Sequence, residues 1–204
     1  MVKLSALFLT AFFTLAYLNP ASGVEVAEIE NLLVHSPSTV GRFAQEKKLS
    51  ILTKPLISAG DFLIVEDLGV VWNVRSPVTS NLVITQDQVL MSDRAPSNAG
   101  RTTKYVAKVL MLILSGNLDA ITDVFHIISV ELKQDDQWTL ELEPKTTILK
   151  KFLSGITLCG GRTIETVYLE ESSGDSTRLI LTEIEHFDPV PESMIERFSL
   201  RSDP

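Results

Sequence analysis

Hydrophobic and polar positions in residues 40–72 follow the short period of β-strands. Aromatic and branched side chains gather in dense runs, and Pro55, Gly60 and Gly69 interrupt them where strands must end or bend. This pattern predicts strand, turn, strand, turn, strand. Residues 81–92 add a hairpin about Gln86-Asp87, so we expect an antiparallel meander of about five strands in this half of the chain.

The spacing becomes helical in residues 105–114, and Ser115-Gly116-Asn117 ends that pattern. The run VLMLIL within it is more apolar than a helix lying half in water needs to be. Two interpretations stay open. The segment is a core helix, or it covers a hydrophobic cavity and meets a ligand on its inner side.

Strand patterns resume in the second half, after a short helix expected at residues 118–124. They fall at residues 125–133, 138–143, 155–158, 163–170 and 178–184, with a helix at 24–34 and a short helix or turn at 194–198. A meander of about ten strands must curl or close. The predicted fold class is α+β, mostly β: a curved antiparallel half-barrel whose concave hydrophobic face is covered by helices.

The N-terminal residues have the pattern of an export signal. Lys3 precedes the apolar run Leu4–Leu18, and Ala21-Ser22-Gly23 offers small residues for cleavage. We predict a signal peptide at 1–23 and a single domain at 24–204. An uncleaved anchor is the alternative, disfavoured because the apolar run is shorter than the ~20 residues that span a bilayer.

Charge limits the classes of partner. The chain has 18 basic and 26 acidic residues, a net charge of −8. This balance argues against nucleic acid and against anchoring to anionic lipid head groups, but not against an isolated acyl chain. The charged residues 45–48 are interpreted as the solvated side of an edge strand, and the acidic residues of the last strands as a solvated sheet face.

Candidate chemistry is sparse. The histidines His35, His126 and His186 lie far apart without a metal-ligand spacing, and the lone Cys159 has the surroundings of a small packed strand residue. The sequence shows no nucleophile motif and no phosphate loop. We therefore expect neither an enzyme nor a bound cofactor or metal, and a secreted hydrolase is disfavoured.

Four ordered motifs resemble one family. They are G-R-F-x-Q-x-K-x-L at 41–49, P-L-x-S-x-G-x-F at 55–62, L-G-V-V-W at 68–72 and W-x-L-x-L-x-P at 138–144. Each motif is weak alone, but the ordered set, over residues 40–185, resembles the periplasmic lipoprotein carriers, the LolA-like proteins.

This resemblance implies a periplasmic carrier that holds the acyl chains of a lipoprotein or other lipid in a hydrophobic cavity. The implied partners are an inner-membrane exporter as donor and an outer-membrane receptor, with transient membrane contact, no nucleic acid and a monomeric chain. Family members carry a basic residue and a proline where this chain has Glu66 and Asp67. An acid cannot donate the hydrogen bonds of a latching arginine, so the chain better resembles a divergent branch that accompanies envelope glycolipid or polyene-lipid export.

The predicted ligand-binding residues are the aromatic and branched side chains of the first strands and the inner side of the central helix. They are Phe43, Phe62, Ile64, Val70, Trp72, Tyr105, Val106, Val109, Leu110 and Ile113. Period 2 leaves open which strand parity faces the cavity. The alternative function is an accessory or docking protein of an envelope lipid or glycolipid export system, without bound cargo.

Overall fold

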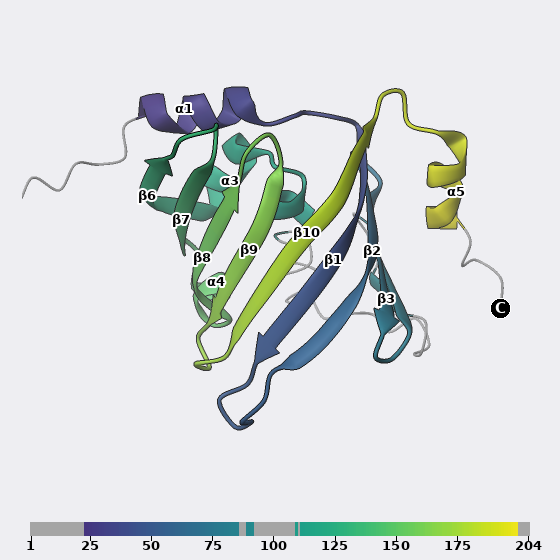
Figure 1. The fold of residues 1–204 in the computed structure, drawn as a ribbon, viewed down its shortest axis with the longest axis horizontal. Helices are drawn as coiled ribbons and strands as arrows, with labels where there is room; N and C mark the ends of the chain where they lie inside the picture. The colour runs from purple at the N-terminus through teal and green to yellow at the C-terminus, as the bar shows by residue number, and fades with distance from the viewer. Residues whose placement is uncertain (1–22, 86–88, 92–108, 110, 200–204) are drawn as a thin grey trace, which may run out of the picture.

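The computed structural model describes residues 23–85, 89–91, 109 and 111–199 (Figure 1). Its strands are β1 Ser38–Lys48, β2 Leu56–Val65, β3 Gly69–Ser76, β4 Ser80–Thr85, β5 Val89–Met91, β6 Phe125–Leu132, β7 Trp138–Pro144, β8 Leu153–Gly160, β9 Ile164–Glu171 and β10 Ser176–Phe187. Its helices are α1 Gly23–Leu32, α3 Leu118–Val124, α4 Thr147–Lys150 and α5 Glu192–Ser199, and residues 109 and 111–114 are also helical.

All ten strands of the described residues form one antiparallel sheet. Its order is β5-β4-β3-β2-β1-β10-β9-β8-β7-β6, so two meanders of five strands meet where β1 pairs with β10. The sheet curves, and α3 lies on its concave side (Figure 1). The predicted curved antiparallel half-barrel is confirmed.

Two pairs of glycine and phenylalanine pack tightly where β1 lies against β2. Gly41 pairs with Phe62, and Phe43 pairs with Gly60. A Cβ atom at Gly41 would lie 2.6 Å from the Phe62 ring, and one at Gly60 would lie 2.9 Å from the Phe43 ring. The pairing register shifts beside both glycines, and such bulges bend a sheet. The glycines therefore let two aromatic rings lie flat on a strongly curved sheet.

The concave face holds the larger hydrophobic core. α1, α3 and the helical residues 109 and 111–114 pack there against the sheet, and Ile29, Ile113, Ile121 and Phe125 are almost fully buried. Gly116, with φ of 69°, follows the helical residues, and its N–H donates to the carbonyl of Ile113 (3.1 Å). A residue in the left-handed region is a common helix end, so the predicted stop at 115–117 is confirmed.

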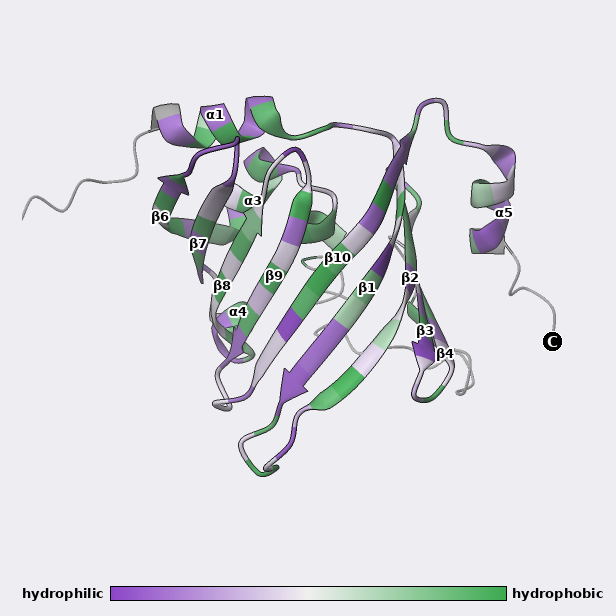
Figure 2. Cartoon of the chain, viewed as in Figure 1, coloured by the Kyte–Doolittle hydropathy of each residue, from purple (hydrophilic) through white to green (hydrophobic). Residues whose placement is uncertain are grey.

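A second hydrophobic cluster lies on the convex face. Leu63, Val65, Val71 and Val83 form its buried part, and Met194 and Phe198 of α5 pack against it. Figure 2 shows hydrophobic positions along both meanders, not on one half of the sheet alone. Residues 62–65 are all buried because helices cover this part of the sheet from both sides.

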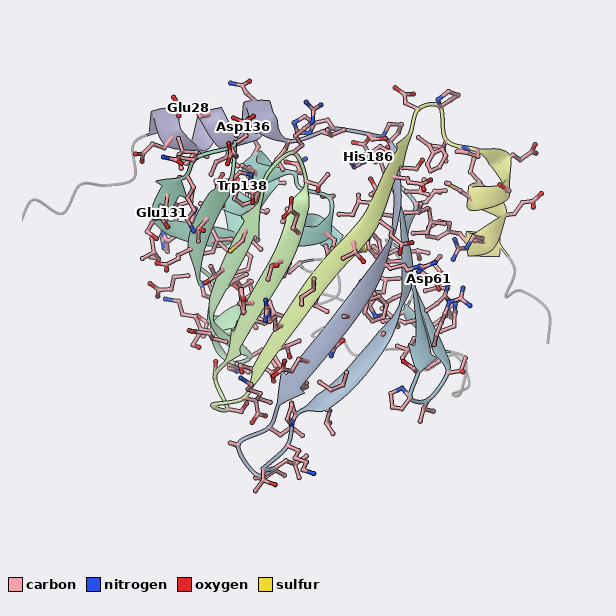
Figure 3. The ribbon with its side chains drawn as sticks, in the orientation of Figure 1. Glu28, Asp61, Glu131, Asp136, Trp138 and His186 are labelled. Atoms are coloured by element: carbon pink, nitrogen blue, oxygen red, sulfur yellow. The ribbon has the colours of Figure 1, made fainter. Side chains whose placement is uncertain are left out.

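Asp61 ties α5 to the convex face (Figure 3). Its carboxylate accepts hydrogen bonds from Asn73 Nδ2 (2.9 Å) and Arg75 Nε, and the Arg197 guanidinium of α5 lies 3.6 Å away. Burial alone would raise the pKa of Asp61, but these hydrogen bonds and the two arginine charges together lower it below its usual value. The carboxylate is therefore ionised at neutral pH.

One interpretation of the sequence is wrong. Residues 45–48 do not lie on an edge strand, because β1 is paired on both sides, with β2 and with β10. The charge gathers at the end of this central strand, where Glu46 and Lys48 form an ion pair (3.6 Å). Polar side chains are tolerated there because the sheet extends beyond the helices that cover it.

Candidate functional site

Three aromatic rings form a stack on the concave face. Phe43 and Trp72 are stacked with ring centroids 3.9 Å apart, and the centroid of the Phe62 ring lies 5.9 Å from that of Trp72. Both pairs are inclined by 21°. β1, β2 and β3 each supply one ring, and the opposed glycines described above leave the space for them. The stack gives the middle of the concave face a flat apolar floor.

A cavity of about 310 Å³ lies beside this floor. Met111 and Leu114 border it from the covering side, and strands of both meanders supply its remaining apolar lining. The described apolar residues that line it are Val70, Trp72, Leu82, Ile84, Met111, Leu114, Leu169 and Leu179. Its size lies at the lower end of the ~300–1,000 Å³ typical of ligand sites.

Polar residues gather where the cavity meets the ends of β1, β9 and β10. Gln45, Lys47, Glu171 and Thr177 line it there. Lys47 Nζ lies 2.9 Å from Glu171 Oε1, and the Thr177 hydroxyl donates to the same carboxylate (3.2 Å). The acidic residues of the last strands were predicted to form a solvated sheet face. Glu171 departs from this prediction, because its side chain is half-buried and forms part of the polar rim.

A second cavity, of about 360 Å³, lies near the opposite ends of β1 and β2. His35, Glu66, Asp67, Met111 and Leu112 are among its lining residues. Glu66 and Asp67 are exposed in the turn between β2 and β3, and Asp67 has a φ of 62°. The two acids therefore border the helical residues, at the place where the family resemblance leads one to expect a basic latch.

His186 lies on β10, opposite Thr39 in the β1–β10 pairing (Figure 3). Its Nδ1 lies 3.0 Å from the Thr39 hydroxyl, and its Nε2 is buried without a hydrogen-bond partner among the described residues. Burial lowers the pKa of His186, so the imidazole is neutral at pH 7. A small cavity of about 40 Å³ lies between this histidine, Phe62 and Leu181.

The structure places the predicted site residues unevenly. Phe43, Phe62, Ile64, Val70 and Trp72 all lie in the concave cluster, so these strand residues share one face. The described helical residues of the prediction, Val109 and Ile113, are buried in the same cluster. Tyr105, Val106 and Leu110, like the turn Gln86-Asp87, lie outside the described residues.

Only part of the predicted set lines a cavity. Val70 and Trp72 line the first cavity, Ile64 lines the second, and Phe62 lines the small cavity beside His186. Sequence reasoning missed the lining residues of other strands, Leu82, Ile84, Leu169 and Leu179. Leu82 and Ile84 alternate along β4 in the same way as Phe62 and Ile64 along β2. This two-residue period in the sequence could have identified them as residues of the same sheet face.

The described lining of the first cavity is mainly apolar. Within the part of the chain that the structure describes, no three His, Cys, Asp or Glu side chains lie close enough to hold a metal ion. No helix in that part is long and apolar enough to cross a membrane. What the arrangement can do is enclose an apolar group between the sheet and the helical residues, with a polar rim at one end.

The fold and the cavity together define a half-open antiparallel barrel with an apolar interior under helices. The family model for the outer membrane lipoprotein carrier protein LolA matches residues 35–197, and the chain therefore belongs to the LolA family. This family is the one that the sequence motifs resemble. No curated protein sequence matches the chain.

Two solved structures are among those similar to this chain. A LolA superfamily protein from Nitrosomonas europaea is 12% identical, with a TM-score of 0.47, over 85% of this chain and 96% of that one. The MucA/MucB complex of Pseudomonas aeruginosa contains a chain 12% identical, with a TM-score of 0.46, over 83% of this chain and 60% of that one. The chain thus spans about six-tenths of the length of that second relative.

Proposed function

We propose that this protein is a periplasmic carrier that binds the acyl chains of a lipoprotein or other lipid and moves them between the inner and outer membranes. The observation that carries the proposal is the 310 Å³ cavity, lined by apolar residues of both meanders and by Met111 and Leu114. Membership of the lipoprotein carrier family supports it. No catalytic step is required, because the protein only shields its cargo from water.

The physical basis is the transfer of methylene groups out of water. Each buried methylene contributes about 0.8 kcal/mol, so a long acyl chain binds without any charged contact. The polar rim of Lys47, Glu171 and Thr177 can then meet the head group or the aqueous end of the cargo. Release requires widening of the cavity, and Met111 and Leu114 are the described side chains that border it opposite the sheet.

Uptake of a fluorescent fatty acid by the purified, delipidated protein tests the proposal. Leu169→Trp places a larger side chain in the cavity and should weaken uptake about tenfold or more, because the acyl chain loses several buried methylenes. Ile128→Trp is the matched control, since Ile128 is 54% exposed on β6 and does not line the cavity. It should take up the probe like the wild type.

Equal uptake by Leu169→Trp and wild type would show that this cavity does not hold the chain. Absence of uptake by the wild type, together with absence of co-purifying lipid in mass spectrometry of the protein from its native envelope, would refute the carrier function. The docking protein without cargo would then replace it.

A further inference from the structure

Two exposed segments at one end of the half-barrel combine apolar side chains with lysines. The first is the β1–β2 connection and its flanks, KKLSILTKPLI at 47–57. In it Ile51 is 86% exposed, and Leu52, Leu56 and Ile57 are also exposed. The β1–β2 connection is the lowest described part of the molecule in Figure 1. Exposed apolar side chains grouped in this way mark an interaction site.

The second segment is KTTILKKF at 145–152, which contains α4. Ile148 and Phe152 are exposed in it, whereas Leu149 is fully buried and anchors the helix. Like the first segment, it contains no acidic residue. The two segments lie almost a hundred positions apart in the sequence, yet each has exposed branched or aromatic side chains beside lysines.

The turn between β9 and β10 connects the two segments. The Ser50 N–H donates to Asp175 Oδ1 (2.8 Å) on one side of this turn. On its other side the Ser172 N–H donates to the Phe152 carbonyl (3.0 Å), and the Ser172 hydroxyl donates to the Lys150 carbonyl (2.9 Å). These hydrogen bonds hold the two segments in a fixed relation along one end of the sheet. We call the two segments, residues 47–57 and 145–152, the basic apolar end.

Lysines are segregated to this end. Among the lysines that the structure describes, Lys133 alone lies elsewhere, after β6 at the opposite end. The lysines of the basic apolar end are Lys47, Lys48, Lys54, Lys145, Lys150 and Lys151. Lys47, Lys48 and Lys150 form ion pairs with acids that lie on the strands themselves. Lys54 and Lys151 are exposed within the two segments. The two segments thus carry six lysines and no acid on a protein whose net charge is −8, while Glu171 and Asp175 beside the turn that connects them offset part of this positive charge.

We propose that the basic apolar end docks on the surface of an anionic lipid bilayer. Ile51 and Leu52 are exposed in the projecting β1–β2 connection, and apolar side chains on such a loop can enter a deformable medium. Lysines beside such residues lie at the level of anionic head groups while the apolar side chains enter the acyl boundary. The net negative charge of the chain still opposes tight binding, so the contact is reversible.

Docking at this end has a consequence for the cargo, and this step rests on the proposed function. The polar rim of the 310 Å³ cavity contains Lys47 and Thr177, which pair with each other where β1 ends and β10 begins. The cavity therefore meets the same end of the sheet as the two segments. A docked protein would hold this rim beside the bilayer, and an acyl chain could pass between them with little exposure to water.

Co-sedimentation with vesicles tests the docking itself, using delipidated protein purified from its native envelope. The vesicles contain phosphatidylcholine and phosphatidylglycerol at about three to one, or phosphatidylcholine alone. Wild-type protein should sediment with the mixed vesicles and lose binding as salt rises. The double variant Ile51→Asp, Phe152→Asp should lose at least about tenfold in affinity for the mixed vesicles. Two apolar contacts with the bilayer are replaced by charges that the anionic surface repels.

Ile128→Asp is the matched control, since it places the same charge on an exposed residue of β6 outside the basic apolar end. It should bind like the wild type. Lys54→Glu, Lys151→Glu should weaken binding to the mixed vesicles more than binding to phosphatidylcholine alone. Circular dichroism and a thermal melt check that each variant is folded, as expected for exposed positions.

Wild-type protein that stays in the supernatant with both kinds of vesicle would overturn the proposal and favour a protein partner for this end. Equal binding of the wild type and the Ile51→Asp, Phe152→Asp variant would overturn it as well. Failure of the carrier function can be distinguished from failure of the docking. Leu169→Trp should lose acyl uptake yet keep vesicle binding, whereas loss of docking in the double variant should leave uptake of a soluble fluorescent fatty acid unchanged.

Discussion

Replacing Gly41 with alanine tests how the aromatic rings are held on the concave face. The new Cβ would lie 2.6 Å from one carbon of the Phe62 ring and 2.7 Å from another. Ordinary van der Waals contact begins near 3.4 Å, so the ring must move by about 1 Å towards Trp72. Overpacking of this kind typically costs about 1–3 kcal/mol. For a domain of this size that lowers the thermal midpoint by about 2–12 °C.

A double-mutant cycle with Phe62→Leu isolates the cause. Phe62→Leu alone removes part of a buried ring and should cost about 1–2 kcal/mol. In the double variant the shorter side chain no longer meets the new methyl group, so the two losses should not add. We expect a favourable coupling of about 1 kcal/mol or more, measured from urea unfolding curves with unchanged m-values.

Gly60→Ala provides the contrasting case. Its Cβ would lie 1.8 Å from the main-chain oxygen of Asn73, so the backbone itself must move. Adding Phe43→Leu should therefore not rescue Gly60→Ala, although the Phe43 ring is also close. Losses in Gly41→Ala and Phe62→Leu that add to within about 0.5 kcal/mol would refute the explanation, because the ring would then not be the obstacle.

Two further predictions concern Asp61 and Trp138. The pKa of Asp61 is lower in the folded protein than the ~3.9 of an unfolded aspartate, so its stabilising contribution is present above that pH and is lost as the pH falls through the folded pKa. Asp61→Asn should reduce stability at neutral pH and flatten the acid limb of a stability–pH profile; an unchanged limb would contradict this. Trp138 is 1% exposed and its Nε1–H donates to the Gly161 carbonyl (2.8 Å). Trp138→Phe should cost about 2–4 kcal/mol in urea unfolding, from the void and the unpaired carbonyl, and a loss below about 0.5 kcal/mol would disprove it.

Local patterns in the sequence predicted most of the fold. The dense runs of 62–65 and 70–72 predicted strands, and the structure covers these strands on both faces, with α5 on one side and the helical core on the other. Which parity faces the concave side did not follow from the strands, because period 2 is the same on both faces. The covering helices decide it, through contacts that no short window of sequence contains.

The candidate site was harder to predict for the same reason. The cavity lies between strands of both meanders, with Leu82 on β4 and Leu179 on β10, and its size depends on side-chain packing. The charged run at 45–48 was assigned to an edge because the pairing of β1 with β10 joins residues far apart in the sequence. The same pairing brings Lys54 and Lys151 to one end of the molecule, and the net charge of the chain conceals that local excess.

The junction between β1 and β10 also sets the order in which the protein can fold. Ser38 and the Phe187 carbonyl form a hydrogen bond across a sequence separation of 149 residues, and β10 is the partner of β1 on the side away from β2. During synthesis β1 therefore has one open side until nearly the whole chain has emerged. Long-range closure of this kind is slow and leaves strand edges exposed to aggregation.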